Sequence, residues 1–143
     1  MTELVELLQE GRRRELAQAR FYRFLSADAE RAGDVAAAER LNDLLADEQH
    51  HVSRLTARIL ELGERPRDAG AGDATVPALH AWEAEARKRE QGEVKWYEEA
   101  LCRVADPDTA DVLRAILGSE RHHSEKLAGK WMPAGPARPK ETT

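Results

Sequence analysis

A short motif that can bind metal occurs twice in this chain of 143 residues. A glutamate is followed three positions later by a histidine, as Glu48-x-x-His51 and again as Glu120-x-x-His123. A helix places residues three apart on nearly the same face, so each carboxylate and its imidazole can reach one site. Carboxylate and imidazole ligands without thiolates suit iron, manganese or zinc. One copy is weak evidence, because glutamate-rich helices often contain it, but two copies predict a metal site.

Further carboxylates precede each copy of the motif at matching positions. Glu15 lies seven residues before Tyr22 in the first half of the chain, and Glu90 lies seven residues before Tyr97 in the second half. Glu93 adds a carboxylate three residues after Glu90, on nearly the same helical face. Each half therefore carries the same order of chemical groups. This repeat predicts two helical hairpins that are chemically similar.

The glutamates interrupt stripes that are otherwise apolar. Around Glu48, apolar residues recur at spacings of three and four, and the glutamate takes the place of one of them. The other stripes are interrupted near their middles in the same way. If four helices pack on these stripes, five carboxylates and two imidazoles converge inside the bundle. They are Glu15, Glu48, His51, Glu90, Glu93, Glu120 and His123.

Such a cluster requires positive charge to neutralise it. Burying one unpaired carboxylate costs several kcal/mol, and the neighbouring positions on the stripes hold no lysine or arginine. Two divalent cations would supply four positive charges against five formal negative charges. One glutamate from each of two helices plus Glu-x-x-His from each of the other two is the ligand plan of ferritin-like proteins. We therefore predict a centre of two metal ions.

Four helices must position these groups. Apolar periodicity predicts helices over 2–32, from an N-cap at Asp34 to Gly63, from 75 to about 105, and after the turn at 105–111 to about 131. The loop at 63–76 is long for a compact domain and suits a crossover along a bundle. We expect an all-α, antiparallel four-helix bundle over residues 1–132, with this crossover between its second and third helices. Residues 133–143 are expected to form a flexible tail.

Composition excludes several other functions. The net charge of −5 gives no footprint for nucleic-acid binding. The single cysteine, Cys102, rules out an internal disulfide and a Cys-x-x-Cys site, and its apolar surroundings predict a buried thiol. No apolar run approaches the ~18 residues of a membrane span, and the N-terminal segment does not resemble a signal peptide. We expect a cytoplasmic protein that contacts neither nucleic acid nor membrane.

The pattern resembles the di-iron domain of rubrerythrins over residues 3–131. The resemblance lies in Glu15 with Tyr22, EQHH at 48–51, Glu90 and Glu93 ahead of Tyr97, and ERHHSEKL at 120–127. It implies a ferritin-like bundle with two irons that reduces hydrogen peroxide to water. It also implies that the five glutamates and two histidines named above are the ligands. In that family the extra carboxylate, here Glu93, lets one iron exchange between carboxylate and histidine.

Several alternatives stay open at this stage. Rubrerythrins typically carry a rubredoxin domain with two Cys-x-x-Cys pairs, which a chain with one cysteine lacks, so an external donor such as a rubredoxin would be required. The other candidates are a ferroxidase that uses oxygen and a di-metal oxygenase with an apolar substrate pocket. Manganese or zinc could replace iron. Tyr22 and Tyr97 are either core aromatics or hydroxyl donors to the ligand carboxylates, and the chain is expected to form a homodimer or larger assembly.

Overall fold

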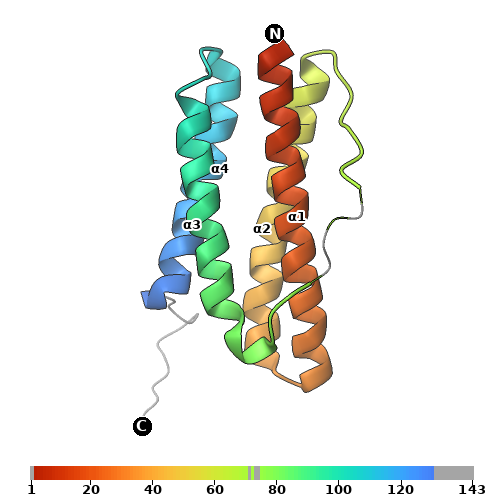
Figure 1. Cartoon of the computed structure of the whole chain (residues 1–143), viewed down its shortest axis with the longest axis vertical. Helices are drawn as coiled ribbons and strands as arrows, with labels where there is room; N and C mark the ends of the chain where they lie inside the picture. The colour runs from red at the N-terminus through yellow and green to blue at the C-terminus, as the bar shows by residue number, and fades with distance from the viewer. Residues whose placement is uncertain (1, 71, 73–74, 131–143) are drawn as a thin grey trace.

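A computed structural model describes residues 2–70, 72 and 75–130 as four long antiparallel helices (Figure 1). The helices are α1 (Thr2–Ala32), α2 (Val35–Glu61), α3 (Trp82–Leu101) and α4 (Pro107–Glu125). A short 3₁₀ turn, η1 (Leu79–Ala81), precedes α3, and a π-helical turn, η2 (Lys126–Lys130), follows α4 and leaves helical backbone at Ala128 and Gly129. The predicted tail at 133–143 lies outside the described residues. None of the described helices combines the length and apolarity that crossing a bilayer requires.

The first hairpin forms where the sequence predicts it. Gly33 has a φ of +71°, a left-handed conformation that glycine adopts without strain and that reverses the chain after α1. Asp34 then caps α2, because its side chain accepts a hydrogen bond from the backbone N–H of Ala37. The two helices pack against each other along their length. The predicted antiparallel pairing of the first two helices is confirmed.

The second hairpin is held by a cap that also contacts the first. Asp106 accepts hydrogen bonds from the backbone N–H and the hydroxyl of Thr109, and Pro107 occupies the first turn of α4. Arg58 of α2 donates to Asp106 over 2.8 Å and to the Thr109 hydroxyl over 2.9 Å. This end of the bundle is therefore fastened across the two hairpins.

Both ends of α3 differ from the sequence prediction. Helix α3 begins at Trp82 rather than near Thr75, because the residue before Pro77 is restricted to extended backbone and the chain then passes through η1. The same helix ends at Leu101, since the turn into Asp106 needs the residues that follow. Cys102 therefore lies beyond the helix and is exposed, so the predicted buried thiol is wrong.

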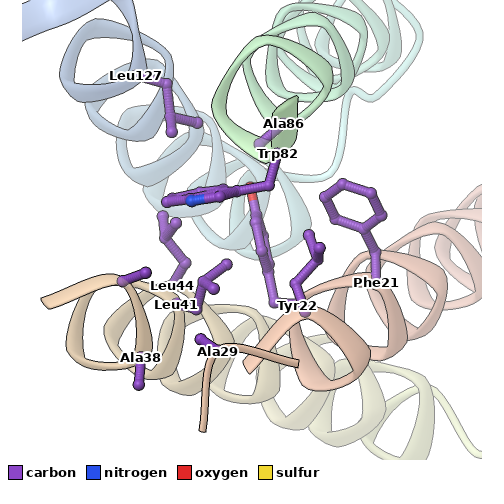
Figure 2. Close-up of a cluster of buried hydrophobic side chains, with 11 residues drawn as sticks. Phe21, Tyr22, Ala29, Ala38, Leu41, Leu44, Trp82, Ala86 and Leu127 are labelled. Carbon is purple, nitrogen blue, oxygen red and sulfur yellow. The ribbon is translucent and has the colours of Figure 1, made fainter. Parts of the chain in front are cut away.

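The apolar core consists of two clusters, one on each side of the polar middle. The lower cluster joins α1, α2 and α3 with Leu127 of η2, and Figure 2 shows the Trp82 ring of α3 lying over Leu41 and Leu44 of α2. The upper cluster includes Leu8 of α1 and Ile116 of α4. Along α1 these clusters occupy opposite ends, with Glu15 between them. The glutamates consequently lie in a polar layer that apolar side chains close off along the bundle axis.

The crossover between α2 and α3 runs back along the bundle beside the first hairpin (Figure 1). Its first part is bound to α1 by the buried side chain of Gln9. That amide donates to the carbonyl of Arg65 over 2.8 Å and accepts from the backbone N–H of Arg67 over 3.0 Å. Arg12 donates to the carbonyl of Arg67 over 2.7 Å. These bonds satisfy loop backbone groups that cannot pair within a helix.

Replacing Asp106 by alanine tests the cap that joins the hairpins. Loss of the cap and of the Arg58 contact should lower the free energy of unfolding of the metal-free protein by about 1–2 kcal/mol, a fall in Tm of about 3–8 °C. Thermal unfolding followed by circular dichroism measures the change. Asp111→Ala, which removes an exposed carboxylate from the same helix, is the control and should have almost no effect.

Candidate metal centre

Six of the seven predicted ligand residues converge in the polar layer. Their side chains form two overlapping groups, and within each group one ligand atom per residue lies within 4.8 Å of the others. The groups are Glu15, Glu48, His51 and Glu120, and Glu48, Glu90, Glu120 and His123. All four glutamates and His123 are fully buried. Both groups contain Glu48 and Glu120, so these two carboxylates lie between the two candidate metal positions.

Each histidine turns the same ring nitrogen toward the carboxylates. The Nδ1 atom of His51 lies 2.9 Å from Glu48 and 3.2 Å from Glu15. The Nδ1 atom of His123 lies 3.1 Å from Glu120 and 3.6 Å from Glu90. Each Glu-x-x-His motif thus brings its histidine against its own glutamate and against the single glutamate of the same hairpin. The sequence repeat is reproduced as a repeat in space.

The two histidines differ in what their other nitrogen contacts. The Nε2 atom of His123 lies 2.8 Å from a carboxylate oxygen of Asp47. A carboxylate at that position keeps a proton on Nε2, so the lone pair of Nδ1 is free to bind metal. The residue corresponding to Asp47 in the other motif is Ser119, which carries no charge. Asp47 directly precedes Glu48 in the sequence, but its contact with His123 depends on the packing of α2 against α4 and was not predicted.

Two buried tyrosines connect the hairpins. The Tyr22 hydroxyl donates to Glu90 over 2.5 Å, and the Tyr97 hydroxyl donates to Glu15 over 2.6 Å. Each tyrosine therefore holds the single glutamate of the opposite hairpin. Burial and the nearby glutamate charges raise the pKa of both phenols well above the usual value, so both stay protonated and act as donors. The hydroxyl-donor alternative describes these side chains.

Three buried carboxylate oxygens of the polar layer are free to bind a cation. Glu48 Oε2, Glu90 Oε1 and Glu120 Oε2 are buried without a hydrogen-bond partner in the described structure. Buried carboxylate oxygens without a partner are costly, and each can accept a metal ion. The ion-pair partners of the central carboxylates are the two histidines. The residues present therefore fit two metal ions.

Charge repulsion within the layer is strongest at the two shared carboxylates. Burial, followed by the charge of Glu90, holds the pKa of Glu48 well above its usual range. Burial and the same Glu90 charge do this for Glu120. Without metal, both carboxylates therefore keep their protons to a higher pH than an exposed glutamate does. Metal ions that occupy the layer would displace those protons.

The pKa values of the two glutamates that are not shared, Glu15 and Glu90, shift in the opposite direction. Burial acts to raise the pKa of Glu15 and of Glu90, but hydrogen bonds with His51 and with His123 outweigh it and lower both values. Burial disfavours the charged ring of His123, yet its carboxylate neighbours, Asp47 first among them, raise its pKa to about 11. The metal-free layer thus favours the protonated forms of His123 and of the two shared glutamates.

Glu93, the seventh predicted ligand, belongs to neither group. Its carboxylate is almost buried and accepts two hydrogen bonds from Arg14, of 3.1 and 3.0 Å. One of the five predicted carboxylates is therefore neutralised by an arginine, although the neighbouring positions on the stripes hold no lysine or arginine. Arg14 is not on the stripe of α1, but its long side chain passes over the ring of Trp96 and arrives beside the layer. The role of Glu93 as a metal ligand stays a prediction.

The fold of this chain matches two bacterioferritins. One, from Desulfovibrio desulfuricans, has a di-iron site described in different catalytic states and aligns with a TM-score of 0.84 at 20% identity, over 90% of this chain and 77% of that chain. The other, from Mycobacterium tuberculosis, aligns with a TM-score of 0.84 at 21% identity, over 90% and 84%. No family model and no curated protein matches the sequence.

These matches confirm the predicted fold class, a ferritin-like four-helix bundle, and they do not distinguish the rubrerythrin family within it. At such low identity the likeness establishes the fold and leaves function to the residues of this chain. The carboxylate and imidazole cluster at the middle of the bundle fits a di-iron centre. The six residues of this cluster come from all four helices.

The raised pKa values predict how the metal-free protein responds to pH. Glu48 and Glu120 stabilise the fold fully below the unfolded value of about 4.5 and lose this contribution as pH rises through their raised folded values. His123 does the same between about 6.5 and about 11. The Tm of chelator-treated protein should therefore fall between about pH 5 and about pH 9.

Glu48→Gln removes one of these titrating groups and should make that dependence shallower, whereas Glu39→Gln on the exposed face of α2 should leave it unchanged. Calorimetry at several pH values measures both. A Tm that rises over this range in the metal-free protein would contradict the charge distribution described above.

Proposed function

We propose that this chain is an iron-handling protein of ferritin-like type, whose di-metal centre oxidises Fe(II). The observation that carries the proposal is the pair of buried ligand groups that share Glu48 and Glu120. One metal would be held by Glu15 and His51, the other by Glu90 and His123, with the shared carboxylates between them. Two ferrous ions held there would supply two electrons, enough to reduce oxygen to the peroxide level or hydrogen peroxide to water.

The surrounding side chains prepare these ligands. Tyr22 donates to one oxygen of Glu90, and Tyr97 donates to one oxygen of Glu15. Each hydrogen bond fixes the orientation of its carboxylate and leaves the other oxygen for a metal ion. Asp47 fixes the ring of His123. The apolar clusters on both sides exclude water along the bundle axis, so charge interactions within the layer are strong. Fixed ligands in a closed layer can hold both the ferrous and the ferric pair.

A rubrerythrin-type reduction of hydrogen peroxide is the second candidate. It is favoured by one observation, the fifth carboxylate Glu93, which lies beside the layer and is almost buried. This activity would require electrons from an external donor such as a rubredoxin. A di-metal oxygenase has less support, because the cavity that adjoins the layer between α1 and α3 is lined mainly by charged side chains. The homodimer or larger assembly and the cytoplasmic location stay predictions.

Metal content tests the ligand assignment. We expect about two iron ions per chain after anaerobic loading and desalting, measured by elemental analysis. Replacing both Glu48 and Glu120 by alanine should abolish this binding, because each metal loses two ligands. The double variant Glu39→Ala and Glu125→Ala removes two exposed glutamates from the same helices and serves as the control. A Glu48/Glu120 variant that folds and retains two irons would refute the assignment.

The choice of oxidant separates the two candidate functions. For the proposed ferroxidase, stopped-flow absorbance should show oxygen oxidising the Fe(II)-loaded protein at a rate within about tenfold of hydrogen peroxide, a difference below about 1.4 kcal/mol in barrier. Glu93→Ala should then leave that ratio unchanged. Oxidation that is much faster with peroxide, and that loses this preference in Glu93→Ala, would instead support the rubrerythrin-type peroxidase.

A further inference from the structure

We propose that Arg14 is a positioning residue that competes with metal for Glu93. In this arrangement Arg14 keeps the Glu93 carboxylate at the side of the polar layer, and Glu93 becomes a ligand only when its ion pair with Arg14 opens. The inference rests on the proposed di-metal function and adds to it a residue that sets how readily the layer accepts metal.

Arg14 and Glu93 lie beside two of the proposed ligands. Arg14 directly precedes Glu15 on α1, and Glu93 follows Glu90 by less than one turn on α3. The pair therefore bridges α1 and α3 beside two of the proposed ligands. Because Glu90 and Glu93 share a helical face, side-chain rotation can direct Glu93 toward the layer without movement of the helix.

Two hydrogen bonds hold the Glu93 carboxylate against Arg14. Both nitrogens of the Arg14 fork donate to both oxygens of Glu93, at 3.1 and 3.0 Å. This arrangement satisfies the carboxylate as an acceptor and is among the stronger side-chain interactions in proteins. The Glu93 side chain is 10% exposed and that of Arg14 is 26% exposed, so water screens the pair only partly. Glu93 held in this way is not available to a metal ion.

The surroundings of Arg14 provide an alternative position for its guanidinium. Glu10 lies one turn earlier on α1, and its carboxylate is already 3.8 Å from Arg14. An open cavity of about 320 Å³ between α1 and α3 gives the side chain room to move. Arg14 can therefore exchange a nearly buried partner for an exposed one. The exchange keeps its charge paired while it releases Glu93.

Equilibrium binding of Mn²⁺ to the full chain tests this competition without any turnover. Calorimetric titration would compare wild-type protein with Arg14→Gln, Glu93→Gln and the double variant. We expect Arg14→Gln to tighten Mn²⁺ binding about tenfold, which is what the loss of one charged hydrogen-bonded competitor allows. In the Glu93→Gln background the same change should alter binding less than about threefold, because the competitor has no target.

Two controls separate competition from simple charge repulsion. Arg13→Gln removes a neighbouring exposed cation that pairs with Glu10, and it should leave binding within about twofold of wild type. Arg14→Lys keeps the charge but loses the two-pronged geometry, so it should tighten binding by an intermediate factor. Circular dichroism checks that each variant is folded.

The outcomes distinguish failure of this inference from failure of the proposed function. Equal tightening by Arg14→Gln with glutamate or glutamine at position 93 would overturn the competition and leave only a charge effect. No tightening by Arg14→Gln would overturn it as well. Wild-type protein that binds no Mn²⁺ in the polar layer would contradict the di-metal proposal itself, and this inference with it.

Discussion

The repulsion among four fully buried carboxylates is the constraint on which the rest of this structure depends. Glu15, Glu48, Glu90 and Glu120 share one layer of the bundle, and the charge of one raises the pKa of another. A core of this kind lowers stability unless protons or cations neutralise it. The same four residues in a surface patch would lower the free energy of unfolding very little. Their burial therefore indicates that they serve a function at the expense of stability.

The remaining contacts across the bundle hold this layer in place. Each tyrosine crosses from one hairpin to the single glutamate of the other, so hydrogen bonds to the polar layer join the hairpins as well as apolar packing. Arg58 fastens the far end of the bundle by reaching from α2 to the cap of α4. Two apolar clusters enclose the layer from both directions along the axis. Rigid surroundings of this kind keep ligands in position when the charge of a bound metal changes.

Sequence reasoning predicted those features that depend on local periodicity. The stripes gave four helices, and polar residues on the stripes identified Glu48 and His51 as members of a buried cluster. It could not predict contacts that depend on how helices are rotated against each other. Arg14 lies off the stripe, yet its length brings it to Glu93, and Asp47 meets His123 only because α2 and α4 are adjacent. The start of α3 was placed too early because the signal at Pro77 marks extended backbone before the helix.

Anomalous X-ray diffraction at the iron absorption edge tests the central claim most directly. Crystals loaded with Fe(II) under anaerobic conditions should show two peaks in the polar layer, one beside Glu15 and His51 and one beside Glu90 and His123. The carboxylates of Glu48 and Glu120 should lie between the peaks. Both peaks should disappear in data collected below the edge. A single peak, or iron bound only to surface carboxylates while the layer holds none, would contradict the account of a di-metal centre.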